Sequence, residues 1–185
     1  MNKPWLESYP AGVPAEIDIS RYGSINEVFD ESCTRFGERI AFINMDTRVS
    51  YAELHQAATR FASWLQHRGL KPGDRIALMM PNILQYPVAL FGALRAGLVV
   101  VNTNPMYTAR ELKHQLIDSG ARAIVIVENF AHVLQQVRGE VPVEFVITTQ
   151  IGDLLKFPKN LLINLALKYV RKAVPPWTLP GAVSF

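Results

Sequence analysis

The sequence of 185 residues contains a single cysteine, Cys33, and lacks any apolar run of the ~20 residues that a membrane-spanning helix needs. One cysteine excludes an internal disulfide framework and is typical of a reducing cytoplasm. We interpret Cys33 as a small hydrophobic residue on a helix, with a nucleophilic thiol as the alternative. The opening residues MNKPWLESYPAGVPAE carry acids and prolines where a secretory signal needs apolar residues. These absences predict a protein that is soluble or peripheral to a membrane.

Several motifs that hold phosphates or activate nucleophiles are also missing. Neither G-x-G-x-x-G after a strand nor G-x-x-x-x-G-K-[ST] occurs, so neither a dinucleotide fingerprint nor a Walker A loop is supported. The G-x-S-x-G elbow of hydrolases is absent. The histidines are far apart and form no H-E-x-x-H pair, which argues against a metal site: His55, His67, His114 and His132. We expect His114 and His132 to lie on helix surfaces rather than to act as bases.

Charge is sparse over most of the chain. Charged residues make up 19% and hydrophobic residues 49%, a balance typical of a globular protein. The net charge of +3 is too small, over the whole chain, to predict nucleic-acid binding. The cations of residues 154–177 stand apart, because this stretch holds no acid and five basic residues: Lys156, Lys159, Lys168, Arg171 and Lys172.

The stretch from residue 75 to 127 is the part around which the chain is organised. Three apolar runs of strand length alternate in it with two segments of helical periodicity. The runs are nearly continuous Val, Ile, Leu and Met, as strands buried on both faces of a parallel sheet require. Right-handed crossovers place helices on both sides of such a sheet. We therefore predict an α/β fold, with a layered, mostly parallel sheet and helices on both faces.

Local signals predict where the elements begin and end. Three capping-box patterns predict helix starts: Ser24–Glu27, Ser50–Glu53 and Thr108–Glu111. Helical spacing predicts that one face of the first helix, the inward face, carries Ile25, Val28, Phe29, either Ser32 or Cys33, and Phe36. A strand at 40–44 and a turn at Asp46–Arg48 predict a small hairpin. A helix near 130–137 and a strand near 143–148 continue the alternation.

The pattern divides the chain into three parts. Residues 1–23, rich in proline and aromatic residues, predict an extended arm that lies on a surface and is docked by its aromatic side chains. Residues 24–150 form the α/β core. Residues 151–185 comprise a basic helical stretch from 154 to 174, with a break at Pro158, and a connection without a terminal cap. The end therefore resembles a truncation, and we expect a piece of a longer protein.

The turn after the strand near 98–102 is the candidate ligand site. Asn104, Pro105 and Tyr107 lie at the carboxyl end of that strand, where open α/β sheets bind ligands. The alternative is structural: Asn104 and Pro105 make the turn, Tyr107 covers the core, and Thr108 caps the next helix. The residue types leave both interpretations open.

Two short motifs resemble core motifs of the adenylate-forming (acyl-activating) enzymes. They are SYAEL at 50–54 and LRAG at 94–97, the latter followed by VVVNTNP. The longer run from 79 to 121, together with WLESYPAGVPAEI and the final LPGAVSF, is similar to the bacterial long-chain fatty-acid–CoA ligases. The resemblance extends over essentially the whole chain.

The resemblance implies a two-step ligase that uses ATP and Mg²⁺. The carboxylate of a long-chain fatty acid attacks the α-phosphate to give acyl-adenylate and pyrophosphate, and coenzyme A then displaces AMP. The family's phosphate loop, ribose-binding acid, metal-site Thr and Glu and C-terminal lysine do not occur here. We therefore expect the N-terminal subdomain of a cytoplasmic ligase loosely attached to the inner membrane. We assign it no catalytic residue, no bound cofactor and no activity of its own.

Within that interpretation, Asn104, Pro105 and Tyr107 border a cleft shared with the missing part. The basic stretch either meets anionic lipid as an amphipathic element or packs its leucine face on the sheet or on missing parts. Two rival functions belong to other classes. One is a stand-alone module that binds a nucleotide or acyl ligand without chemistry, and the other is a domain that joins ligases into homodimers.

Overall fold

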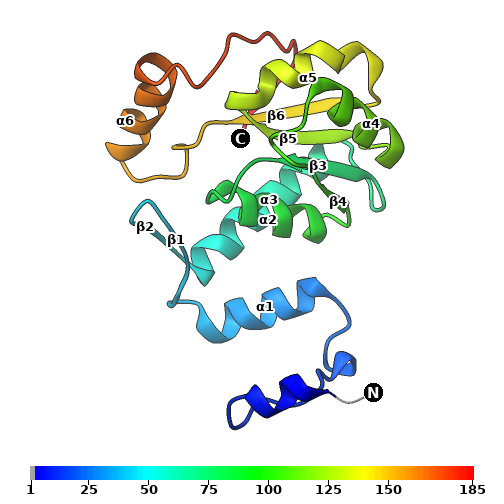
Figure 1. Cartoon of the computed structure of the whole chain (residues 1–185), viewed down its shortest axis with the longest axis vertical. Coiled ribbons are helices and arrows are strands. Elements are labelled where there is room, and N and C mark those ends of the chain that lie inside the picture. Colours follow the sequence, from blue (N-terminus) through cyan, green and yellow to red (C-terminus); the bar gives the residue numbers. More distant parts are fainter. Residues whose placement is uncertain (1–2) are drawn as a thin grey trace.

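The computed structural model describes residues 3–185 and centres on one sheet (Figure 1). Its five strands are β3 (Arg75–Met79), β4 (Val99–Asn102), β5 (Ala123–Val127), β6 (Phe145–Thr149) and β7 (Val183–Ser184). Their order is β4-β3-β5-β6-β7, and every neighbouring pair is parallel. The predicted α/β class and parallel sheet are confirmed.

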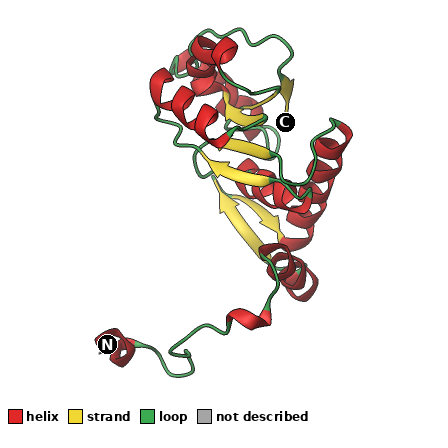
Figure 2. Ribbon diagram, turned by 90° about the vertical axis from the view of Figure 1, so that its right-hand side faces the viewer, coloured by secondary structure: helices red, strands yellow, loops and turns green. Residues whose placement is uncertain are grey.

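Helices cover both faces of the sheet, as Figure 2 shows. On one face lie α2 (Tyr51–His67) and α3 (Gln85–Arg95), and on the other α4 (Ala109–Ser119) and α5 (Ala131–Val137). Side chains of one strand alternate between the two cores, so that Ile76 faces α2 and α3 while Ala77 faces α4 and α5. Single 3₁₀ turns flank α5 at Glu128–Phe130 and Arg138–Glu140.

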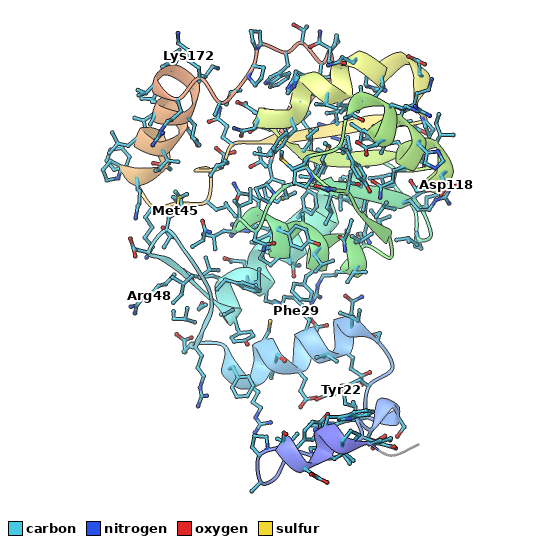
Figure 3. All side chains as sticks on the ribbon, in the orientation of Figure 1. Tyr22, Phe29, Met45, Arg48, Asp118 and Lys172 are labelled. Atoms are coloured by element: carbon cyan, nitrogen blue, oxygen red, sulfur yellow. The ribbon has the colours of Figure 1, made fainter. Side chains whose placement is uncertain are left out.

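Helix α1 (Ile25–Phe36) packs beneath α2 and α3 along a narrow stripe. Phe29, which Figure 3 labels on α1, stacks on Phe91 with ring centroids 3.9 Å apart, and Cys33 of the same helix is also buried. Ile25 and Val28 remain 64% and 39% exposed, so the predicted inward face is wrong for them. The reason is that, within residues 3–185, α2 and α3 contact α1 along one side, so a wide apolar face has no further surface to cover.

The three helix starts are capped as the sequence predicts, with one difference. Ser50 and Thr108 form complete capping boxes with Glu53 and Glu111. Ser24 accepts the backbone N–H of Glu27, but the Glu27 carboxylate accepts from Gly23 instead of Ser24. The first box is therefore only half formed.

The predicted hairpin is present as β1 (Ile40–Asn44) and β2 (Thr47–Ser50). Its turn lies at Met45 and Asp46, both with positive φ, which is one residue earlier than predicted. Two central residues of positive φ give the type of turn whose twist matches that of paired strands.

The N-terminal arm differs from the prediction. It contains two 3₁₀ turns, Pro4–Ser8 and Ile19–Arg21, and extends away from the rest of the molecule (Figure 2). Trp5 and Tyr9 stay 55% and 42% exposed, so these aromatic side chains do not dock the arm on a surface. The short turns bond mainly to their own neighbours, as in the bond from Tyr9 N–H to the Leu6 carbonyl.

The basic stretch forms α6 (Lys159–Leu165), which continues as one π-helical turn, η5 (Ala166–Val170), at the side of the molecule (Figure 1). Residues 154–158 form turns, a bend and coil, and residues 171–174 are also non-helical, so the predicted helix is confirmed only over residues 159–170. A helix does not extend up to Pro158 because proline disfavours the helical conformation of the residue before it. No helix in residues 3–185 has both the length and the apolar character needed to cross a bilayer.

Candidate functional site

The carboxyl edge of the sheet carries a buried polar network next to β6. Gln85, at the start of α3, is 1% exposed and donates from Nε2 to Thr149 Oγ1 at 3.0 Å and to the Gln150 carbonyl oxygen at 2.7 Å. Its Oε1 is buried and has no partner among the residues the structure describes. A buried amide held this way fixes the strand end, because losing its bonds would leave polar atoms without water.

The network continues from β6 towards α6. Asp153 Oδ2 accepts from the backbone N–H of Gln150 at 2.7 Å and from Thr149 Oγ1 at 3.0 Å. The other oxygen of Asp153 accepts from Asn164 at 3.1 Å, and Asn164 Oδ1 accepts from the Gly152 N–H at 2.7 Å. A Cβ at Gly152 would lie 2.6 Å from Asn164 Oδ1, so only glycine lets the Asn164 side chain come close enough to accept from the Gly152 N–H.

This network has the chemistry of a scaffold. It is built from amides, hydroxyls and carboxylates, and Glu128 adds a second acid through its bond from Gln150 Nε2 at 3.0 Å. Over residues 3–185, no lysine or arginine donates into it. Carboxylates without cations repel phosphate, so the network suits the holding of β6 and α6 better than the binding of a nucleotide.

The predicted ligand-site residues lie at the same sheet edge, beyond β4. Asn104 Oδ1 accepts from the Met106 N–H at 2.9 Å, and the Tyr107 N–H donates to the Asn104 carbonyl at 3.1 Å. Tyr107 is half-buried against the core on the α4 and α5 side. These are the contacts of the structural alternative: a turn, a cover over the core and, at Thr108, a cap. The turn stands apart from the Gln85 network, which lies at the β6 end.

An apolar groove of about 450 Å³ lies on the α2 and α3 face, where the sheet reaches β7. Its lining comes from distant parts of the chain: Ala57, Arg60, Phe61, Trp64, Val88, Ile147, Leu154, Ser184 and Phe185. A smaller groove shares Ala57, Val88 and Leu154 with it and leads to the hairpin at Phe42. No local sequence signal marks these grooves, because their walls join residues more than 100 positions apart.

The basic residues of the last part of the chain do not behave alike. Lys159 donates to Asp46 Oδ2 at 3.0 Å and to the Met45 carbonyl at 2.6 Å, so it ties α6 to the hairpin turn. Among the described residues, no acid pairs with the other four: Lys156, Lys168, Arg171 and Lys172. Lys172 projects from the outer end of this segment in Figure 3.

Cys33 and the histidines are scattered over the described chain, and His55 alone of them lies against an acid, with its Nε2 3.4 Å from Asp30 Oδ1 and 3.0 Å from Arg95 Nη2. Cys33 is buried, and this burial, reinforced by the charge of Asp30, raises the pKa of its thiol above the ordinary value. A thiol that stays protonated is a poor nucleophile, as expected of a small hydrophobic residue. His114 lies exposed on α4, and His132 is half-buried on α5, where its Nδ1 has no hydrogen-bond partner among the described residues. In the described part of the chain, no three His, Cys, Asp or Glu residues gather as metal ligands would.

The comparisons with known proteins decide the family. The family model described as "AMP-binding enzyme" matches residues 29–179. The chain belongs to this family. Over its whole length it is 53% identical to a protein named long-chain-fatty-acid–CoA ligase from Salmonella typhimurium and to one of the same name from Escherichia coli O157:H7. It covers 33% of each, so the chain spans about a third of the length of these curated relatives.

A solved structure agrees on the fold. The crystal structure of a long-chain-fatty-acid–CoA ligase from Archaeoglobus fulgidus superposes with a TM-score of 0.65 at 23% identity. The match covers 76% of this chain and 29% of that one. The resemblance inferred from the motifs is thereby confirmed at the level of family and fold.

Proposed function

We propose that this chain is the N-terminal third of an ATP-dependent long-chain fatty-acid–CoA ligase. The whole enzyme would join a fatty acid to coenzyme A through an acyl-adenylate, and release AMP and pyrophosphate. The observation that carries the proposal is the 53% identity over the full chain to proteins that bear this name. We place the enzyme in the cytoplasm, peripheral to the inner membrane, since its substrate dissolves in lipid.

Within that enzyme, we assign the chain the role of scaffold. Its polar network is internal and holds no cation for phosphate, which supports a nucleotide and Mg²⁺ site built by residues outside this chain. The 185-residue chain alone should therefore give no product with ATP, magnesium, oleate and coenzyme A. Formation of oleoyl-CoA and AMP by this chain would contradict the assignment.

A chimera tests the ligase proposal directly. The chain replaces the matching third of the Salmonella typhimurium ligase, and oleoyl-CoA and AMP are measured after confirming by circular dichroism that the protein is folded. We expect turnover, because the relatives align along the whole chain. The same ligase without its first third is the control and should be inactive. A folded chimera that activates no fatty acid would refute the proposal.

We also propose that Asn104, Pro105 and Tyr107 border the substrate cleft in the whole enzyme. Their place at the carboxyl edge of the sheet supports this. In the chimera, Tyr107→Ala should lower turnover, whereas Ala at Met106, which is 75% exposed, should not. Thermal unfolding of both variants separates a cleft effect from lost packing. Unchanged turnover in Tyr107→Ala would remove these residues from the cleft.

A further inference from the structure

Helix α6 and the turn η5 present their apolar side chains to solvent. Leu162, Tyr169 and Val170 are 61%, 65% and 78% exposed, and Phe157 before them is 81% exposed. Leu161 and Leu165 are also exposed, and no residue of α6 or η5 is buried. A surface helix ordinarily turns such residues towards the core. Single exposed apolar residues are common, but a contiguous set of this size marks an interaction site.

Polar contacts hold α6 against the protein, while Ile163 of α6 and Leu167 of η5 are half-buried. Asn164 bridges Gly152 and Asp153, and the Asn129 side chain donates to the Ala173 carbonyl at 2.8 Å, just beyond η5. Lys159 adds its bonds to the hairpin turn. Because these contacts fix the rotation of the helix, the outward leucines are a built feature of the fold. They also show that the leucine face does not pack on the sheet.

The charges around this apolar patch are of one sign. Lys156, Lys168, Arg171 and Lys172 are exposed, and residues 154–177 contain no acid. Lys168 lies over the ring of Tyr169, 5.9 Å from its centroid. An apolar face with lysine and arginine at its border is the pattern of a helix that lies in the plane of an anionic bilayer. Long basic side chains place their charge at the headgroups while their stems cover apolar surface.

We propose that these residues form a docking surface for anionic lipid, which we call the α6 surface. Its apolar members are Phe157, Leu161, Leu162, Leu165, Tyr169 and Val170, and its cations are Lys156, Lys168, Arg171 and Lys172. The apolar side chains enter the boundary between headgroups and acyl chains, and the cations meet the lipid phosphates. The inference rests on the proposed peripheral location and deepens it by naming the surface; it is argued from the exposure and charge of these residues, and its test needs no ligase activity. In a ligase, the α6 surface brings the enzyme to the membrane that holds its substrate.

Vesicle flotation of the 185-residue chain tests the α6 surface. We expect binding at least about tenfold tighter to phosphatidylcholine vesicles that contain phosphatidylglycerol than to phosphatidylcholine alone, with the difference falling as salt is raised. The double variants L161S/L165S and K168E/K172E should each lose most of that binding. Two matched controls should keep it: Ile117→Ser, at an exposed position of α4, and R35E/K71E, which changes the charge equally. Circular dichroism confirms that each variant is folded.

Three outcomes would overturn the proposal. The first is that the unchanged chain fails to bind anionic vesicles, or that both α6 variants bind them as tightly as the unchanged chain. The second is that sedimentation without lipid shows a dimer that the L161S/L165S substitutions dissociate. The α6 surface would then bind a second copy of this chain instead of lipid. The third is that the 185-residue chain floats with anionic vesicles but the chimera described above does not. That result would mean that the rest of the ligase covers the α6 surface. Flotation needs neither ATP nor turnover, so an inactive chimera would leave this result standing.

Discussion

At the scale of single residues, Gly92 shows how closely α3 approaches α2. A Cβ at this position would lie 2.8 Å from Phe61 Cδ1 and 2.9 Å from the Ala58 carbonyl oxygen. Gly92→Ala should therefore lower the free energy of unfolding by roughly 1–3 kcal/mol, since overpacking outweighs the better helix propensity of alanine. Urea unfolding measures the change. Gly139→Ala is the control, because nothing lies within 4 Å of its Cβ, and equal midpoints for the two variants would contradict the close packing.

Two carboxylates bonded to Arg122, those of Asp74 and Glu144, make the stability of the fold depend on pH. Its guanidinium donates to Asp74 at 2.5 Å and to Glu144 at 2.6 and 2.9 Å. The hydrogen bond from Arg122 lowers the pKa of Glu144, and the Lys71 backbone N–H, aided by Arg122, lowers the pKa of Asp74. A carboxylate with a lowered folded-state pKa stabilises the fold above its unfolded pKa of about 4. That stabilisation is lost as the pH falls through the folded-state pKa.

The unfolding temperature of the unchanged chain should thus drop as the pH is lowered from about 5 towards 2. In the Arg122→Gln variant the drop over the same pH range should be smaller. The reason is that the variant no longer lowers the pKa of Glu144. Differential scanning calorimetry over this range measures the effect. Lys113→Gln, which removes the exposed pair of Lys113 with Glu140, should keep the acid dependence of the unchanged chain. The same acid dependence in Arg122→Gln would show that Arg122 does not cause it.

At the scale of elements, α6 depends on its polar anchors more than on burial. Asn164→Ala leaves the Gly152 N–H and an Asp153 oxygen without their partner, so the segment should loosen locally. Trypsin should then cleave after Lys168, Arg171 and Lys172 several-fold faster, with little change in the overall unfolding temperature. Leu162→Ala, at an exposed position of the same helix, is the control. Equal cleavage rates would mean that Asn164 does not hold the helix.

How far the sequence predicts an element depends on the range of the contacts that form it. The complete capping boxes at Ser50 and Thr108 and the left-handed Gly120 were predictable, because their bonds span only a few residues. The buried parallel strands were predictable from their continuous apolar runs. The buried face of α1 was not, because it depends on where α3 lies, as the contact of Phe29 with Phe91 shows.

The candidate site follows the same rule. The turn at Asn104 was predictable, because Asn-Pro after a strand is a local signal. The Gln85 network was not, because the bond from Gln85 to Thr149 joins residues 64 positions apart. A lone glutamine in an apolar helical stretch was the only hint of it. The outward leucines of α6 were also unpredictable, since spacing shows that a helix has an apolar face but not which way that face points.

At the scale of the whole molecule, the groove beside Phe185 should bind apolar dyes. Trp64 lines the groove, and a W5F/W177F variant retains it as the single tryptophan of the chain. In that variant, excitation energy should pass from Trp64 to anilinonaphthalene sulfonate bound in the groove. A volume of about 450 Å³ is enough for such a ligand. Sensitised dye emission measures the transfer. Adding Trp64→Phe should abolish it, and dye binding without transfer from Trp64 would place the dye elsewhere.

The order of the strands bears on how the protein is made. After β4 has paired on one side of β3, β5 joins the opposite, free edge of β3, β6 then joins β5, and β7 joins β6. As these five strands leave the ribosome, each therefore meets a pairing partner that is already synthesised, and none of the five has to insert between two others. The sheet can grow at the pace of translation, with each new edge strand acting as the template for the next.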